Sequence, residues 1–179
     1  MLDYLNLPNV KTLRVHDVDE QEILVDVEGG VRPTRCPDVN CSGEHLVGNG
    51  SNTVVIRDIP RDGKWVWIRL RRRRVKCTIC GRTASFHVNA FHPDRQMTIR
   101  LVLSIQQACL QETCASLSRR IGVDEGTIRD IAKAHIAHLD RSLSFGVPSV
   151  LGLDEFKIYG RPSAILTNIE AKTIYDVLE

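Results

Sequence analysis

The spacing of apolar and polar residues predicts β structure in the N-terminal half of the chain. Partial alternation at 10–15 and 23–27 predicts two short strands joined by a polar turn. Alternation returns at 53–59 and 65–75, and the turn-forming composition of 58–63 joins these two segments into a hairpin. We therefore expect a small β unit followed by a longer hairpin.

From Thr98 onward the apolar positions follow the period of an α-helix. The first apolar stripe consists of Leu101, Val102, Ile105 and Cys109. A shorter stripe begins after Thr113, which suits a helix N-cap, and ends before Gly122, which suits the left-handed position after a helix. Asp124 is the candidate cap of a third helix. Its inner stripe consists of Ile128, Ile131, Ala132 and His135. This order is the helix-turn-helix arrangement, with an ordinary three-helix bundle as the alternative.

After a linker at 141–148 the pattern is that of strands again. Three segments, 150–156, 163–169 and 173–178, predict a three-stranded meander. Asp154 interrupts the first of them, and a carboxylate within an apolar strand costs free energy unless it is paired or binds a metal. Asp154 is therefore the catalytic candidate, although carboxylates from one strand cannot complete a two-metal site.

Charge is uneven along the 179 residues. The net charge is +2, but nine Lys or Arg and one Asp between residues 61 and 82 give this block +8 and leave −6 elsewhere. A local basic block of this kind favours binding to a polyanion. The N-terminus lacks the pattern of a signal peptide, and no window approaches 18 apolar residues. We expect a protein of the reducing cytoplasm that does not enter a membrane.

Six cysteines in such a compartment are more often metal ligands or free thiols than disulfides. Two short pairs, Cys36 with Cys41 and Cys77 with Cys80, lie about 35 residues apart, a spacing that can bring four thiolates to one Zn²⁺ ion. His45 is the alternative ligand. Structural zinc supplies about 10–16 kcal/mol of apparent binding free energy, enough to stabilise a module with little core. The other two cysteines are expected to be buried apolar residues, and the His135/His138 pair lacks a third ligand.

Two sets of residues are candidates for contact with nucleic acid. On the basic strand, the phosphate-binding candidates are Arg69, Arg71, Arg72, Arg73, Arg74 and Lys76. Alternation places Val66, Ile68 and Leu70 on the opposite side of the strand from Arg69, Arg71 and Arg73. On the third helix, the candidates near base edges are Glu125, Thr127, Arg129 and Lys133. The alternative for the arginines is a solvated charged face.

In order and spacing, these parts resemble bacterial insertion-sequence transposases of the ISL-three type. The matching pieces are the Cys36–Cys41 pair, the Asp58-Ile-Pro turn, the basic strand into Cys77-Thr-Ile-Cys80-Gly, the helices from 98 to 139, and Leu151-Gly-Leu-Asp154-Glu155-Phe156. The resemblance implies a zinc-ribbon-like segment, a helix-turn-helix, and a ribonuclease-H-like domain with an Asp-Asp-Glu triad that uses Mg²⁺. Asp154 would be the first carboxylate of that triad. The other two would lie beyond residue 179, so the resemblance implies a truncated catalytic domain.

Together these observations predict a multi-domain α+β protein. Its expected parts are an N-terminal β unit (1–30), a zinc-ribbon-like basic module (31–90), a helix-turn-helix (91–142) and the first strands of an incomplete catalytic domain (143–179). The expected function is sequence-specific binding to double-stranded DNA at the terminal repeats of a mobile element, near the bacterial nucleoid and without strand transfer.

Two rival hypotheses remain open at this stage. In the first, the chain is a fragment of an active transposase. In the second, it is a zinc-ribbon adaptor or a transcriptional regulator. Three strands without covering helices expose apolar surface, which favours dimerisation or aggregation through residues 149–179.

Overall fold

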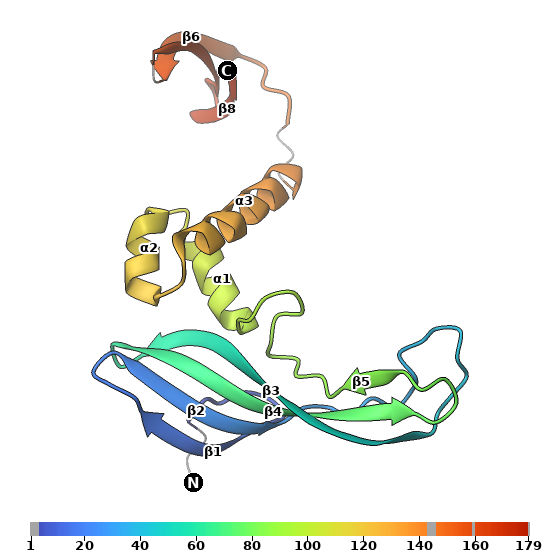
Figure 1. Ribbon diagram of the computed structural model, residues 1–179. Helices are drawn as coiled ribbons and strands as arrows, with labels where there is room; N and C mark the ends of the chain where they lie inside the picture. Colours follow the sequence, from blue (N-terminus) through green and yellow to red (C-terminus); the bar gives the residue numbers. More distant parts are fainter. Residues whose placement is uncertain (1–3, 143–145, 159, 179) are drawn as a thin grey trace. The chain divides into compact units, whose positions relative to one another are not determined.

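The computed structural model describes residues 4–142, 146–158 and 160–178. It has mixed α and β structure and divides into two compact units, Met1–His135 and Ile136–Glu179 (Figure 1). Two sheets and three helices occupy the described residues.

A five-stranded sheet forms the base of the first unit (Figure 1). Its strands are β1 (Val10–Asp17), β2 (Glu22–Gly29), β3 (Leu46–Arg61), β4 (Lys64–Cys77) and β5 (Thr83–Ser85). The order is β1-β2-β4-β3, with β5 also paired to β4. The β2–β4 pair is parallel and the other pairs are antiparallel. The strands of segments 1–30 and 31–90 thus share one sheet, and the four-part domain division stays a prediction.

The β3–β4 hairpin is longer than its sequence pattern predicts. Strand β3 begins at Leu46, and only Asp62 and Gly63 form the turn, with φ angles of 52° and 76°. Two consecutive residues with positive φ match the tight hairpin turn that follows the right-handed twist of the strands. The predicted turn over 58–63 is therefore wrong for its first four residues. Pro60 is tolerated there because β3 is an edge strand and the pairing is irregular between Asp58 and Arg61.

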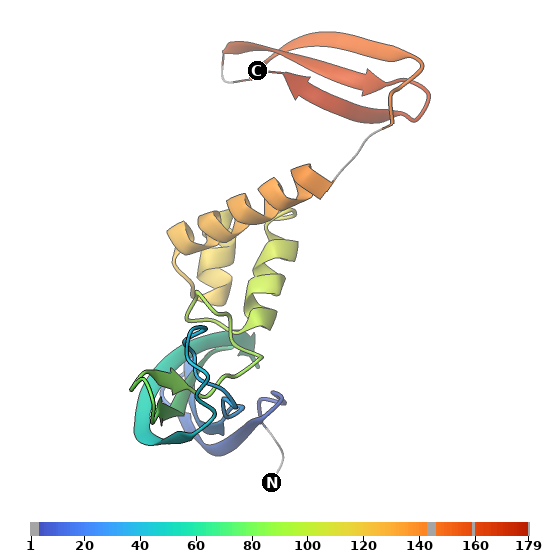
Figure 2. The same ribbon diagram turned by 90° about the vertical axis from the view of Figure 1, so that its right-hand side faces the viewer.

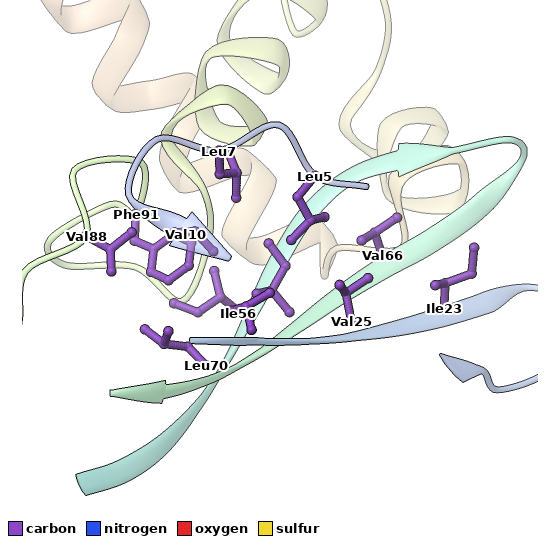
Figure 3. Close-up of a cluster of buried hydrophobic side chains, with 12 residues drawn as sticks. Leu5, Leu7, Val10, Ile23, Val25, Ile56, Val66, Leu70, Val88 and Phe91 are labelled. Atoms are coloured by element: carbon purple, nitrogen blue, oxygen red, sulfur yellow. The ribbon is translucent and has the colours of Figure 1, made fainter. Parts of the chain in front are cut away.

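One face of the sheet carries the larger apolar core (Figure 3). Alternation along β4 directs Val66, Ile68 and Leu70 into this core, where each is at most 1% exposed. The core also includes residues from outside the main strands, namely Leu5, Leu7, Val88 and Phe91. The irregular segment between β5 and α1 therefore contributes two of the buried side chains, Val88 and Phe91.

The helices are α1 (Ile99–Ala108), α2 (Cys114–Ile121) and α3 (Glu125–Ser142). The predictions of Thr113, Gly122 and Asp124 as capping residues are confirmed, and Thr98, which was not predicted as a cap, caps α1. The Thr98 and Thr113 hydroxyls accept hydrogen bonds from backbone N–H groups of α1 and α2, and Gly122 ends α2 with a φ of 72°. The Asp124 carboxylate accepts a hydrogen bond from the N–H of Thr127 at the start of α3. Most of the predicted inner residues are buried in a second core, which includes Leu101, Ile105, Leu117, Ile121, Ile128 and Ile131.

The helices join the sheet along the edge strand β3. Residues 96–98 run beside Arg57, whose N–H donates to Gln96 O and whose carbonyl accepts from the N–H of Thr98, both at 2.9 Å. Asp58, 1% exposed, accepts hydrogen bonds from the Thr98 hydroxyl at 2.6 Å and from Arg100 Nε at 2.8 Å. Helix α1 therefore begins directly on the sheet.

A second contact joins α2 to the other face of the hairpin. The guanidinium of Arg57 stacks on the Trp67 ring, 3.8 Å from its centroid, and donates to Gly122 O at 2.5 Å. The Trp65 indole N–H donates to Arg120 O at 3.3 Å. Sheet and helices are thus held together on both faces of β3 and β4.

The C-terminal unit contains the predicted meander. Strands β6 (Leu151–Ile158), β7 (Arg161–Asn168) and β8 (Thr173–Leu178) pair antiparallel in the order β6-β7-β8 (orange to red in Figure 2). Many of their apolar side chains are exposed, including Leu151, Leu153, Ile174, Val177 and Leu178.

Candidate metal centre and nucleic-acid interface

Four cysteines meet at the end of the hairpin opposite the Asp62–Gly63 turn. Two come from the loop between β2 and β3, one is the last residue of β4, and one follows it in the next turn: Cys36, Cys41, Cys77 and Cys80. Their Sγ atoms all lie within 4.8 Å of one another, and none is in a disulfide. The Sγ–Sγ distance is 3.8 Å for Cys41–Cys77 and 3.3 Å for Cys36–Cys80. A tetrahedron with Zn–S bonds of about 2.3 Å requires sulfurs about 3.8 Å apart, so the arrangement fits Zn²⁺.

Backbone hydrogen bonds position both halves of this cluster. The N–H of Cys36 donates to Gly43 O at 3.1 Å, and the N–H of Cys77 donates to Arg82 O at 2.8 Å. A Cβ at Gly43 would lie 2.7 Å from the sulfur of Cys77, so the loop can approach the cluster only with glycine there. Gly43 is a site residue that sequence spacing did not reveal.

His45, the alternative ligand, takes part through its backbone. Its carbonyl accepts hydrogen bonds from the N–H and the hydroxyl of Thr78, both at 3.2 Å. Its imidazole is not among the grouped metal-ligating side chains of the described residues. The cluster is therefore fully thiolate.

The thiols of Cys77 and Cys36 have pKa values shifted in opposite directions. Backbone N–H groups of Cys80 and Ile79 lower the pKa of Cys77 to about 7. The N–H of Asp38 lowers the pKa of Cys36, but burial and the neighbouring thiols outweigh it and raise that pKa to about 12. The negative charge of the first thiolate opposes ionisation of its neighbours. A bound divalent cation would offset this repulsion and allow all four thiols to ionise.

The cluster takes the place of an apolar core at this end of the hairpin. The buried apolar side chains of the described residues there are those of Leu46, Val75 and Cys77, with Phe86 and Ala84 packed against them. Four protein ligands leave no open position for substrate, which is typical of a structural rather than a catalytic zinc site.

Residues 32–90 match a family model described as the zinc-finger of transposase IS204/IS1001/IS1096/IS1165. The matched range holds all four clustered cysteines and strands β3 to β5. No curated protein and no solved structure matches the chain. The match and the cysteine geometry together fit a structural Zn²⁺ ion. They support the resemblance to the N-terminal part of such transposases over the zinc-ribbon segment.

The arginines of β4 lie on two faces with different surroundings. Arg69 forms a two-pronged ion pair with Asp26 on β2, with distances of 2.5 and 2.8 Å. Arg73 Nη2 lies 3.7 Å from Glu28 Oε2, and Arg71 Nε donates a hydrogen bond to the Ser51 hydroxyl. The hydrogen bond from Arg69 is the largest cause that lowers the pKa of Asp26 to about 2, against the effect of burial. Acidic partners on β2 thus offset this basic face, which the local sequence pattern did not reveal.

The remaining cations of the strand lie on the face that carries the larger core. Arg72 and Arg74 continue the alternation of Leu70 and are half-buried, and Lys76 is exposed. The buried Nε atoms of Arg72 and Arg74 have no hydrogen-bond partner among the described residues. The six predicted phosphate-binding residues are therefore divided between two faces.

The candidate base-reading residues lie at the start of α3. Arg129 is exposed and pairs with Glu125 one turn earlier, at 2.5 Å. Lys133 is also exposed, and Thr127 is half-buried. Gly122, Val123 and Asp124 form a short, glycine-containing connection between α2 and α3. The assignment of these helices as a helix-turn-helix stays a prediction.

Asp154 lies on β6 and is exposed. The premise that this carboxylate is buried in an apolar strand does not hold, and its catalytic role stays a prediction. Among the described residues, the metal-ligating side chains that come together are the four cysteines. None of the helices in the described residues is long and apolar enough to cross a membrane.

Proposed function

We propose that the chain is a zinc-dependent, sequence-specific DNA-binding part of a DDE-type insertion-sequence transposase. The observation that carries this proposal is the match of residues 32–90 to a transposase zinc finger, at a four-cysteine cluster that fixes the end of a cationic strand. The zinc ligands are Cys36, Cys41, Cys77 and Cys80. The partner is the terminal repeat of a mobile element in the bacterial cytoplasm.

The two DNA-contacting parts have different tasks. Strand β4 supplies cations for phosphate oxygens, which give affinity but no sequence information. Helix α3 enters the major groove as the recognition helix, with Glu125, Thr127, Arg129 and Lys133 near base edges. The Arg129 guanidinium exchanges its Glu125 partner for a guanine edge, the contact that arginine makes most often with a base.

Asp154 is the first carboxylate of an Asp-Asp-Glu triad in this proposal. In a complete catalytic domain such carboxylates hold Mg²⁺, which activates the attacking and leaving oxygens. The 179 residues alone bind DNA without cutting it, because Asp154 is exposed on a three-stranded sheet. Cleavage by the purified chain that disappears in Asp154→Ala would contradict this. The homodimer stays a prediction of the sequence.

A DNA titration of the zinc-loaded chain tests the proposal. Duplexes carrying the element's own terminal repeat and a scrambled control are titrated over a range of salt concentrations. We expect tighter binding to the repeat, and a log–log salt slope of about −0.9 for each phosphate contacted. Equal affinity for both duplexes would contradict base reading by α3. No binding at low salt would refute the proposal and favour a protein-binding zinc-ribbon adaptor.

A further inference from the structure

A groove connects strand β4 to helix α3 within the first unit. One hollow, of about 440 Å³, is bordered by Val54, Ile56 and Arg72 on one side and by residues 87–96 on the other. A second hollow, of about 360 Å³, reaches Gln106 of α1 and Ala134 of α3. The two share His92, Asp94 and Arg95. They therefore form one path from the core-side face of β4 to the proposed recognition helix.

This side of β4 has neutral neighbours. Side chains directly across an antiparallel pair lie on the same face of a sheet. Arg72 lies opposite Asn52, Arg74 opposite Ser85, and Lys76 opposite Thr83. None of the three cations has an ion-pair partner within the described ranges, and neither does Arg95.

One carboxylate, that of Asp94, lines the groove. The backbone N–H of Asp94 donates to His92 Nδ1 at 3.2 Å, and the Asp94 carboxylate forms no ion pair with a described residue. Arg72 and Arg95 outweigh its charge within the groove, and Arg74 and Lys76 extend the positive charge along the strand. The path is therefore cationic at its β4 end, whereas the hollow that reaches α3 is lined by one cation, Arg95, and one carboxylate, Asp94.

The opposite face of β4 is less suited to a polyanion. A phosphate there would have to displace Asp26 from Arg69, and it would be repelled by the carboxylates of Asp26 and Glu28. On the groove side, by contrast, the buried Nε groups of Arg72 and Arg74 lack an acceptor. Because these Nε atoms are buried, a phosphate oxygen would pair with the other N–H groups of the two guanidinium groups, in charge-assisted hydrogen bonds that displace no carboxylate.

We infer that the DNA phosphate backbone follows this groove, along Arg72, Arg74 and Arg95 toward α3, and not the face formed by Arg69, Arg71 and Arg73. This inference rests on the proposed function and specifies which surface performs it. It assigns a DNA contact to Arg95, which lies outside both the basic strand and the third helix.

Two double variants with equal loss of charge test the inference. Arg74→Gln/Arg95→Gln removes one cation on the groove side of β4 and one that lines the groove, and Arg69→Gln/Arg73→Gln removes two cations of the opposite face. The first should reduce the magnitude of the log–log salt slope by about 1.8, because each lost phosphate contact removes about 0.9. The second should leave the slope unchanged. The charge-preserving variant Arg74→Lys/Arg95→Lys should retain most of the wild-type slope.

A measurement on the unmutated protein removes any dependence on variant folding. Arginines are modified with phenylglyoxal, with and without the duplex, and read out by mass spectrometry. Bound DNA should protect Arg74 and Arg95 more than Arg69 and Arg73. If the wild-type chain does not bind DNA, the proposed function fails. If it binds, but the Arg69/Arg73 pair flattens the slope as much or is protected as strongly, the inference fails and the proposed function stands.

Discussion

Gly122 is the residue at which helices and sheet approach most closely. Its φ of 72° ends α2 in the left-handed conformation, which the sequence pattern predicts. A Cβ at this position would overlap the Arg57 guanidinium and lie 2.5 Å from the Trp65 ring. The glycine therefore serves a second purpose, close packing, which no local pattern could indicate.

Gly122→Ala is expected to lower the free energy of unfolding by about 3 kcal/mol. Positive φ costs an alanine about 1–2 kcal/mol, and overpacking against the two side chains adds a comparable loss. Gly63→Ala is the matched control, because Gly63 has a φ of 76° but open space around its Cβ position. We expect the control to lose about 1 kcal/mol. Equal losses in urea unfolding would show that packing at Gly122 contributes nothing.

The Asp26–Arg69 pair should make stability depend on pH in the acid range. Folding lowers the pKa of Asp26 from 3.8 to about 2, so its contribution is present above pH 4 and is lost as the pH falls toward 2. Asp26→Asn should cost about 1 kcal/mol at pH 6, a modest value because the pair is partly exposed, and clearly less at pH 2, where about half of the Asp26 carboxylates are protonated.

Urea unfolding of both proteins from pH 7 to pH 2 checks this difference. Zinc release in acid affects both proteins alike, so the difference between them isolates Asp26. Asp62→Asn serves as a control, because Asp62 is 82% exposed and lies 3.8 Å from Arg61. A difference that persists undiminished at pH 2 would count against the ion pair as its cause.

At the scale of elements, the β3–β4 hairpin has a different means of stabilisation at each end. The turn end is buried against the larger core and the helices, whereas the far end has three buried residues and the cysteine cluster. The small core shares no residue with the two larger ones. Loss of zinc is therefore expected to act locally.

Cys77→Ser should abolish zinc binding and unfold the end of the hairpin, with residues 36–46 and 75–85 losing protection from hydrogen exchange. Helices α1 to α3 should retain their circular dichroism. Cys109→Ser is the matched control, because Cys109 packs against the helical core and its thiol bonds to Gln106 O. Unchanged zinc content and melting in Cys77→Ser would rule out the cluster as a structural clip.

Local patterns predicted most elements of this fold but not their neighbours. The strand alternation of β4 and the capping residues Thr113 and Gly122 depend on adjacent residues, and the structure confirms them. The cysteine spacing likewise indicated which thiols meet, because metal ligation restricts spacing. The parallel pairing of β2 with β4 depends on contacts between distant segments, and so does the neutralisation of Arg69. For the same reason the sequence could not show that Arg95 faces Arg72 across a groove.

At the scale of the whole first unit, Asp58 connects three distant segments. It lies in β3, accepts hydrogen bonds from Thr98 and Arg100 at the start of α1, and is buried. Arg100 also donates to Leu5 O at 3.0 Å, which ties in the N-terminal segment. The Asp58-Ile-Pro motif, read from sequence as a turn, thus supplies a buried carboxylate to the junction of sheet and helices.

Asp58→Ala is expected to lower the free energy of unfolding by about 3–5 kcal/mol, because it leaves the Arg100 guanidinium without its buried partner. Thermal and urea unfolding measure this loss. The double variant Asp58→Ala/Arg100→Ala should lose clearly less than the sum of the single variants, since it removes both charges. Additive losses would indicate that the two residues act independently.

The length of β4 has a consequence for any duplex that touches both ends of the first unit. Ten residue steps separate Trp67, beside the helices, from Cys77 at the metal cluster. At about 3.3 Å per residue this is about 33 Å, close to the 34–36 Å of one turn of B-DNA. Segments contacted at the two ends would therefore lie about one helical repeat apart, on the same side of the duplex. An insertion of about five base pairs between them would turn one segment to the far side of the duplex. The length of β4 would therefore set the spacing between the two DNA segments that the protein contacts.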